Sequence, residues 1–399
     1  MPKRYFGAQP TPEQIDAKIA GLGGWFEIDL DRLSANLAAI RARTGVEVMP
    51  VVKNNAYGHG LRPICSALAA DGIKWLMVAK LAEARAIARW DLGCDVVNMD
   101  ALYTDAQFGQ VVEAGITQVV FTEAMATRLN EAALRAGRRA GVFLKIDTGL
   151  HRVGVDHAQA IGLIRKIAAM EGIEIRGTFS TLMQDDTQDQ LILERFQTVL
   201  DQMARDGIDP GFRSVSSTHG IFHYPDAWFD MVRPAMVLFG IYPWAPDRDS
   251  GLEVSQVLTF KARIEELKPV AAGESVTYFG AYTAERDIQV GTLHAGFFDA
   301  LPRELANKAI ILVGGKPCPS IGSISLNHCL FDATDAQAQI GDTVTVIAKE
   351  GVNDLVSTAR TAGWMVYSLL NHLSPFVPRV YYRGGAPVAI EEPPGLPAA

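Results

Sequence analysis

A lysine at the end of an apolar run is the first residue of this chain whose position suggests chemistry. Lys53 directly follows Val51 and Val52 and opens the polar stretch 53–60, Lys-Asn-Asn-Ala-Tyr-Gly-His-Gly. An ammonium group in such a place loses hydration unless a carbonyl or an anion meets it. A desolvated lysine amine is also a natural Schiff-base former. Taken alone, Lys53 fits a snorkelling lysine at the rim of a fold at least as well.

Histidines and glycines elsewhere offer weaker signals. His219 and His223 have the i, i+4 spacing of a metal pair, but the intervening glycine and the absence of a nearby carboxylate motif favour capping or core histidines. His328 and Cys329 are adjacent in an expected strand, so their side chains point to opposite faces. Residues 314–316, Gly-Gly-Lys, lack the spacing of a phosphate loop and indicate a hairpin turn. We therefore expect no metal.

Composition limits the classes of partner. The chain has 399 residues, 48% of them hydrophobic, and a formal net charge of −8. That length allows a sizeable core and two domains. The acidic balance offers no attraction for nucleic acid or anionic lipid, and no apolar run approaches the roughly 18–20 residues that span a bilayer. Four widely separated cysteines and a polar segment 1–24 without a secretory signal predict a cytoplasmic protein.

The elements that must position Lys53 follow from hydrophobic periodicity between residues 46 and 233. Eight short apolar runs alternate there with helical patterns such as 81–89 and 158–170. The runs cover 46–52, 75–79, 95–99, 118–121, 141–146, 173–180, 212–216 and 229–233. Nearly continuous apolar strands separated by helices indicate a parallel sheet covered on both faces. Eight such units predict a (β/α)8 TIM-type barrel, with a doubly wound sheet as the alternative.

The pattern changes after about Asp247. Apolar and polar residues then alternate over short spans, which predicts an antiparallel β domain joined by the early strand 25–28. These spans are 256–264, 274–278, 287–293, 309–313 and 343–348. The expected organisation is an N-terminal extension (1–24), the barrel (25–247), the C-terminal β domain (248–384) and an unpacked Pro- and Gly-rich tail (385–399).

Several motifs, in the right order along almost the whole chain, resemble those of the alanine racemase family, which are fold-type III pyridoxal-phosphate enzymes. They are 26–30 (Phe-Glu-Ile-Asp-Leu), 52–60, 145–154 (Lys-Ile-Asp-Thr-Gly-Leu-His-Arg-Val-Gly), 231–236, 296–303 and 377–379 (Val-Pro-Arg). Their order is more specific than any single motif. The resemblance implies pyridoxal 5'-phosphate as cofactor and an amino acid as substrate.

The resemblance also implies roles at the cofactor. Lys53 would form the Schiff base and act as one of two acid–base groups at Cα. The groups that would contact the cofactor phosphate are Tyr57, Thr218 and the amides of Ala235 and Met236. The two amides would open a helix after the last barrel strand, where N–H groups suit an anion. Ser217 and Thr218 are equally typical of helix caps, and both roles are compatible.

Three basic residues would complete the site according to the resemblance. Arg233 would face the pyridine nitrogen and, as a permanent donor, keep it unprotonated, which weakens the ring as an electron sink and disfavours transamination. Arg152 would contact the phenolic oxygen of the cofactor and the carboxylate of the substrate. Lys145 matches a lysine that is often carbamylated to hold this arginine.

The chain departs from the family at the second acid–base group. The family uses a tyrosine supplied by the neighbouring subunit, and Phe297 stands in its place and cannot move a proton. The histidine that supports this tyrosine is replaced by Thr181. The remaining changes are Leu326-Asn327 for a Met-Asp pair, Ser323 for an arginine, and Pro375 for a tyrosine expected before Val-Pro-Arg. The cofactor half is kept, whereas the half that provides the second base and the entrance is changed.

Three functions remain open. The favoured one is stereospecific chemistry with Lys53 as the only proton carrier: an aldol-type reaction, decarboxylation or elimination. The alternative is an amino-acid racemase or epimerase with another second base. Candidates for that base are His294, Asp299, His328 and His219. A non-catalytic cofactor or amino-acid binder is least favoured, because Lys53 and Arg152 are intact.

The resemblance finally implies a homodimer. The β domain of one chain would cover the barrel mouth of the other, so the active site would lie at the interface. Phe297, Leu326 and Asn327 would then act in trans.

Overall fold

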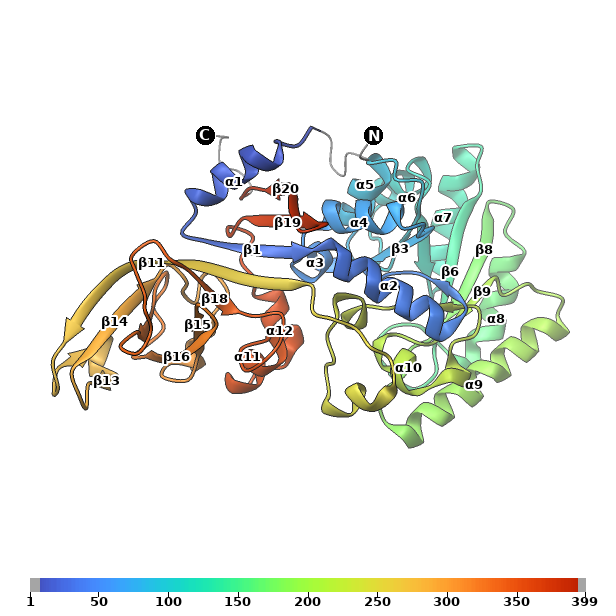
Figure 1. Cartoon of the computed structure of the whole chain (residues 1–399). Helices are drawn as coiled ribbons and strands as arrows, with labels where there is room; N and C mark the ends of the chain where they lie inside the picture. Colours follow the sequence, from blue (N-terminus) through green and yellow to red (C-terminus); the bar gives the residue numbers. More distant parts are fainter. Residues whose placement is uncertain (1–7, 394–399) are drawn as a thin grey trace.

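The computed structural model describes residues 8–393. It consists of a barrel of parallel strands beside a mostly antiparallel sheet, connected by the long strand β11 (Leu258–Val270) (Figure 1). None of the helices in this range is long and apolar enough to cross a membrane.

Eight parallel strands build the barrel. They are β2 (Glu47–Val48), β3 (Trp75–Val78), β4 (Asp95–Asn98), β5 (Thr117–Val120), β6 (Ala140–Asp147), β8 (Ile173–Phe179), β9 (Phe212–Ser214) and β10 (Met231–Val232). The Met77 amide donates to the Pro50 carbonyl (2.9 Å) and the Asp230 amide to the Arg213 carbonyl (3.2 Å), while β10 pairs with β2. These bonds close the ring, so the predicted barrel is confirmed and the doubly wound alternative is wrong.

Helices surround the barrel and bury one face each. They are α2 (Leu30–Thr44), α4 (Leu61–Ala70), α5 (Leu81–Arg89), α6 (Asp105–Glu113), α7 (Glu123–Arg135), α8 (His157–Ala168), α9 (Asp186–Arg205) and the short α10 (Thr218–His223). In α5 the spacing of Leu81, Ala84 and Ile87 places all three on the buried side. This periodicity is the one from which the helix was predicted.

The second sheet has nine strands in the order β14-β17-β16-β15-β18-β11-β1-β19-β20. Besides β11 its strands are β1 (Gly24–Asp29), β14 (Ile288–Leu293), β15 (Ile310–Val313), β16 (Lys316–Ile321), β17 (Cys329–Asp332), β18 (Thr343–Ile347), β19 (Arg379–Arg383) and β20 (Ala386–Glu391). β1 pairs antiparallel with β11 and parallel with β19. The expectation that strand 25–28 joins the β domain is therefore confirmed.

The structure differs from the sequence expectation at both ends. Composition predicts an unpacked tail at 385–399, but β20 pairs antiparallel with β19, because Gly384 and Gly385 (φ +59° and +76°) form a hairpin turn. Residues 394–399 lie outside the described residues. Within the expected extension 1–24, helix α1 (Pro12–Ala20) packs Ile15 into a small core. Two unpredicted helices, α11 (Leu355–Thr361) and α12 (Val366–Asn371), interrupt the β domain.

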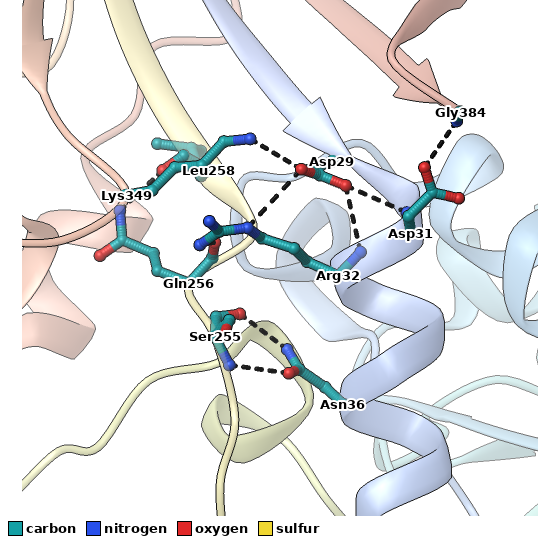
Figure 2. A network of polar contacts seen from close by, with 9 residues as sticks. All are labelled: Asp29, Asp31, Arg32, Asn36, Ser255, Gln256, Leu258, Lys349 and Gly384. Carbon is teal, nitrogen blue, oxygen red and sulfur yellow. Dashed lines mark hydrogen bonds and ion pairs between the residues drawn. The ribbon is translucent and has the colours of Figure 1, made fainter.

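A polar network joins the barrel to the second sheet (Figure 2). Asp29 accepts hydrogen bonds from the amides of Asp31 and Arg32 at the start of α2 and from Nζ of Lys349 (2.7 Å). One turn further along, Asn36 exchanges two hydrogen bonds with the backbone of Ser255 (2.8 and 2.9 Å). The barrel helix α2 is thereby fixed to the segment that leads into β11.

Candidate active site

A cavity of ≈ 610 Å³ opens at the carboxyl ends of the barrel strands, which is the size of a cofactor or substrate site. Nine residues expected at the site line it: Lys53, Tyr57, Lys145, Arg152, Thr181, Ser217, Thr218, Arg233 and Ala235. They come from the carboxyl-terminal ends of five different strands and the loops that follow them, as barrel active sites commonly do. Met236 is buried in the turn behind Ala235 and is not among the lining residues of the described structure.

A left-handed turn presents Lys53 and Tyr57 to the cavity. In α3 (Lys53–Tyr57) the residues at 54–57 all have φ between +52° and +56°. A left-handed conformation costs an L-residue about 1–2 kcal/mol, so surrounding contacts must hold this turn. The Asn55 amide donates to Oε1 of Glu83 (2.9 Å), and Oδ1 of Asn55 accepts from the Leu61 amide (2.7 Å).

The amine of Lys53 is shifted toward its neutral form. Burial lowers the pKa of Lys53, and the guanidinium of Arg152 lowers it further, although Glu83 acts in the opposite direction. A neutral amine is the form that attacks a carbonyl carbon. The environment therefore favours Lys53 as a Schiff-base former over a snorkelling rim lysine.

Arg233 lies at the floor of the cavity and is 4% exposed. Its terminal nitrogens donate to Oγ of Ser214 and to the carbonyls of Ser180 (2.7 Å) and Val215 (3.2 Å). Burial lowers the pKa of Arg233 to about 9, and these oxygen acceptors keep the guanidinium protonated at neutral pH. Its Nε takes part in none of the hydrogen bonds recorded for residues 8–393 and remains a donor for a bound ligand.

Hydroxyl and amide groups gather near Thr218. Its Oγ1 accepts from the amides of Ala235 (3.2 Å) and Val237 (3.5 Å). Residues Met236–Phe239, which follow Ala235, form a short 3-10 helix. The expected contact of the Ala235 and Met236 amides with the cofactor phosphate remains a prediction. Ser217 occupies the N-cap position of α10, without a side-chain capping hydrogen bond.

Tyr367 is a site residue that the sequence analysis missed. It lies on α12 of the second domain and lines the barrel cavity near Tyr57. Burial raises the pKa of Tyr367 to about 12 and also raises that of Tyr57, so both hydroxyls stay protonated donors. The sequence does contain this tyrosine, ten residues before Val377, but the resemblance led us to expect it just before the Val-Pro-Arg motif. Pro375, found there, lines a different cavity.

Lys145 is a buried amine without an acidic partner. Its Nζ donates to Oγ1 of Thr181 (2.7 Å) and lies 4.5 Å above the ring of Phe179. Burial lowers the pKa of Lys145 well below its ordinary value, and the cations Arg233 and Arg152 add to this shift. Burial and the two cations therefore favour the neutral amine, although the carboxylate of Asp147 acts in the opposite direction.

Of the residues that depart from the family, Thr181 lines the barrel cavity, whereas the others lie elsewhere in the chain. Phe297, Leu326 and Asn327 line a separate cavity of ≈ 460 Å³ in the β domain, together with Ser323 and His328. The structure of one chain does not bring them to Lys53. Their expected action in trans remains a prediction.

The candidates for a replacement base also lie outside the lining of the barrel cavity. Asp299 is buried and accepts from the Gly296 amide (2.8 Å), which is a structural role. His219 lies on α10 behind Thr218. His294 and His328 flank Glu265, with N–O distances of 3.2 and 3.1 Å.

Comparison with known proteins gives two family matches and a set of close folds. Residues 28–243 match the model "Alanine racemase, N-terminal domain", and residues 257–381 match "Alanine racemase, C-terminal domain". The alanine racemase of Symbiobacterium thermophilum is 32% identical over 90% of this chain and 96% of its own length. Two solved alanine racemases share the fold. The structure from Clostridium difficile 630 has 26% identity and a TM-score of 0.87, and the match covers 93% of this chain and 98% of that one. The structure from Streptomyces coelicolor A3(2) has 28% identity and a TM-score of 0.84, and the match covers 92% of this chain and 100% of that one.

Proposed function

Since this chain belongs to the alanine racemase family of pyridoxal-phosphate enzymes, we propose that it racemises or epimerises an amino acid at Cα. Lys53 is one proton carrier in this proposal, and a group other than residue 297 is the second. The relatives that match the chain over 90% of its length support a racemase more than the stereospecific chemistry that Phe297 alone favours. Lys53 and Arg152 in the cavity argue against a non-catalytic binder.

The donors in the barrel cavity fit pyridoxal phosphate. The Lys53 amine suits the aldehyde, Nε of Arg233 suits the ring nitrogen, and the hydroxyls of Tyr57, Thr218 and Tyr367 suit the phosphate. When bound, this cofactor withdraws electrons from Cα and makes its proton removable. Arg152 is the exposed cation at the cavity and binds the substrate carboxylate. The Lys53 amine then takes or returns the Cα proton on one face.

We assign the second proton carrier to His328. It lines the same cavity as Phe297, and its Nε2 lies 3.1 Å from Oε2 of Glu265. A carboxylate that orients an imidazole is the usual arrangement of a general base. A histidine beside Phe297 would supply the proton transfer that phenylalanine lacks.

This assignment requires a homodimer, which exposed apolar side chains support. Phe279 is fully exposed (101%), and Tyr278 (71%) and Leu326 (51%) lie with it around the cavity that holds Phe297. Such a patch on a folded chain is typical of an interface. We propose that this face of one chain covers the barrel cavity of its partner.

Incubation of single amino-acid enantiomers in D2O tests the function. A racemase with two proton carriers is expected to incorporate deuterium at Cα and to scramble the configuration of both enantiomers. Removing one carrier leaves exchange with retained configuration on one face only, because a planar centre is then protonated from one side. We expect His328→Asn to show this behaviour, measured by NMR and chiral chromatography.

The controls separate the competing functions. His294→Asn, the other histidine at Glu265, is expected to keep two-sided exchange. If the wild type deuterates one enantiomer with retention, the enzyme uses one base and the racemase proposal fails. A protein that sediments as a monomer with full activity would contradict the assignment of His328.

We also propose that Lys145 carries a carbamate. A neutral buried amine attacks CO2, losing one proton and forming an N–C bond, and the anionic product would be stabilised by Arg152 and Arg233. Protein equilibrated with 13C-bicarbonate is expected to show one protected carbamate carbon in its NMR spectrum.

Lys145→Met should remove that signal, whereas Lys80→Met, at an exposed lysine after strand β3 of the same barrel, should keep it. A signal that persists in Lys145→Met would place the carbamate at another amine.

A further inference from the structure

We propose that His219, His223 and Asp247 form a binding site for a divalent transition metal, Zn²⁺ by preference, behind the wall of the cofactor cavity. The ligand atoms of these three side chains all lie within 4.8 Å of one another. The sequence analysis dismissed the two histidines because no carboxylate was near in the sequence. The fold supplies one from 24 residues further along the chain.

Helix α10 aligns the two histidines. Their i, i+4 spacing places both rings on one face, with ring centroids 5.0 Å apart. The helix is held close to the barrel at Gly220, where a Cβ atom would lie 2.4 Å from Oγ of Ser216. Nε1 of Trp228 also donates to the Gly220 carbonyl (3.0 Å). The histidine pair is thus fixed in place before any metal binds.

Asp247 completes the set from the 3-10 turn η3 (Ala245–Ser250). Its carboxylate is buried, with Oδ1 2.7 Å from Nε2 of His223. Oδ2 accepts from the Trp244 amide (2.8 Å), which orients the group. Two imidazoles and one carboxylate are the ligands of many zinc sites that leave a fourth position open.

Within the part of the chain that the structure describes, the ring of His219 lacks the hydrogen bonds that a buried imidazole normally makes, which indicates a missing ligand. Both of its ring nitrogens are buried, and neither has a hydrogen-bond partner within residues 8–393. Burial lowers the pKa of His219, with His223 adding to the shift, so the ring is in the neutral form that binds metals. An unsatisfied buried polar atom costs about 1–3 kcal/mol, which coordination would remove.

Asp189 adds negative charge next to the cluster. It is fully buried, and its Oδ2 lies 3.8 Å from Nε2 of His219. Metal-bound histidines commonly give their other N–H to such a carboxylate. The ion-pair partners recorded for Asp189 and Asp247 within residues 8–393 are His219 and His223. A divalent cation would balance both carboxylates.

The metal would stiffen one wall of the cofactor cavity. His219 is adjacent to Thr218, and Asp189 accepts from the amides of Met183 (2.6 Å) and Gln184 (3.2 Å), both lining residues of that cavity. The metal would therefore link α10, η3 and the start of α9. The site itself stands on its own geometry and does not depend on the proposed function.

The test uses the full-length holoenzyme, dialysed against a chelator and titrated with ZnCl2 or CoCl2. One equivalent of Co²⁺ is expected to remain after gel filtration and to show the intense visible bands of tetrahedral cobalt. Zn²⁺ at 100-fold its Kd should raise Tm by about 3 °C.

Two variants and one control locate the metal. His223→Ala and Asp247→Asn, the second of which keeps the shape of the side chain, should lose the bound cobalt. His328→Ala is the matched control, because Glu265, His294 and His328 form a second, more exposed cluster. Retention of cobalt in His223→Ala, or its loss in His328→Ala, overturns the proposal. If a variant fails to fold, the cobalt and Tm measurements on the wild-type protein test the proposal. A wild-type protein that binds no cobalt and shows no rise in Tm would show that the cluster is only a hydrogen-bond network.

Discussion

Lys53→Ala is expected to give a folded protein that retains no pyridoxal phosphate after gel filtration and remains colourless. The Lys53 side chain lines the cavity, and its lowered pKa prepares the amine for attack on the cofactor aldehyde. Loss of the amine also removes one proton carrier at Cα. Together these losses should reduce turnover by at least about 10³-fold. Absorbance spectra of the desalted protein and the D2O exchange rate measure both effects.

Lys80→Ala is the matched control for this experiment. Lys80 follows the neighbouring strand β3 and is exposed, so its loss should leave colour and turnover unchanged. Borohydride reduction of the wild type, followed by peptide mass analysis, should find the cofactor on Lys53. A coloured and active Lys53→Ala protein would show that another amine, such as Lys145, holds the cofactor.

The pH dependence of cofactor uptake has a defined direction. Because burial lowers the pKa of Lys53, apoprotein should incorporate pyridoxal phosphate faster as pH rises. The rate of incorporation should reach its plateau at a pH below the ordinary lysine pKa of 10.5. The pKa of Lys145 is lower in the folded state than in the unfolded state, so the unfolded state binds more protons at pH values between the two pKa values. Its contribution to the free energy of unfolding therefore increases with pH, up to the unfolded pKa.

Arg233→Met is expected to lower the free energy of unfolding by about 3–5 kcal/mol, because it leaves buried oxygen acceptors without their donor, at about 1–3 kcal/mol each. The carbonyls of Ser180 and Val215 and the hydroxyl of Ser214 would lose their partner at the barrel floor. Methionine fills the space but donates nothing. Urea unfolding of the apoprotein, followed by circular dichroism, measures the change without the cofactor.

Arg213→Met is the control on the neighbouring strand β9. Arg213 pairs with Asp230, but the two side chains are 40% and 35% exposed, so water replaces the lost contacts. The expected loss is below about 1 kcal/mol. Equal losses for the two variants would show that burial of the Arg233 network contributes little to stability.

Hydrophobic periodicity was sufficient to predict the strands and helices of the barrel. Strand β3 is a short apolar run in which every residue is buried, and the pattern of α5 is visible within nine residues. Such patterns depend on neighbours in the sequence, so they can be read without the fold. The resemblance in ordered motifs added Lys53, Arg152 and Arg233, which the structure brings to one cavity.

Other features depend on contacts between distant residues, and only the tertiary structure decided them. The left-handed turn after Lys53 is held by Glu83, Tyr367 reaches the barrel cavity from the second domain, and Asp247 meets His223 through η3. Composition predicted that the Pro- and Gly-rich end is an unpacked tail, because it does not show that residues of this end pair with β19 as strand β20. Sequence thus determined which side chains carry chemistry, whereas burial and long-range packing decided which of them meet and in which protonation state.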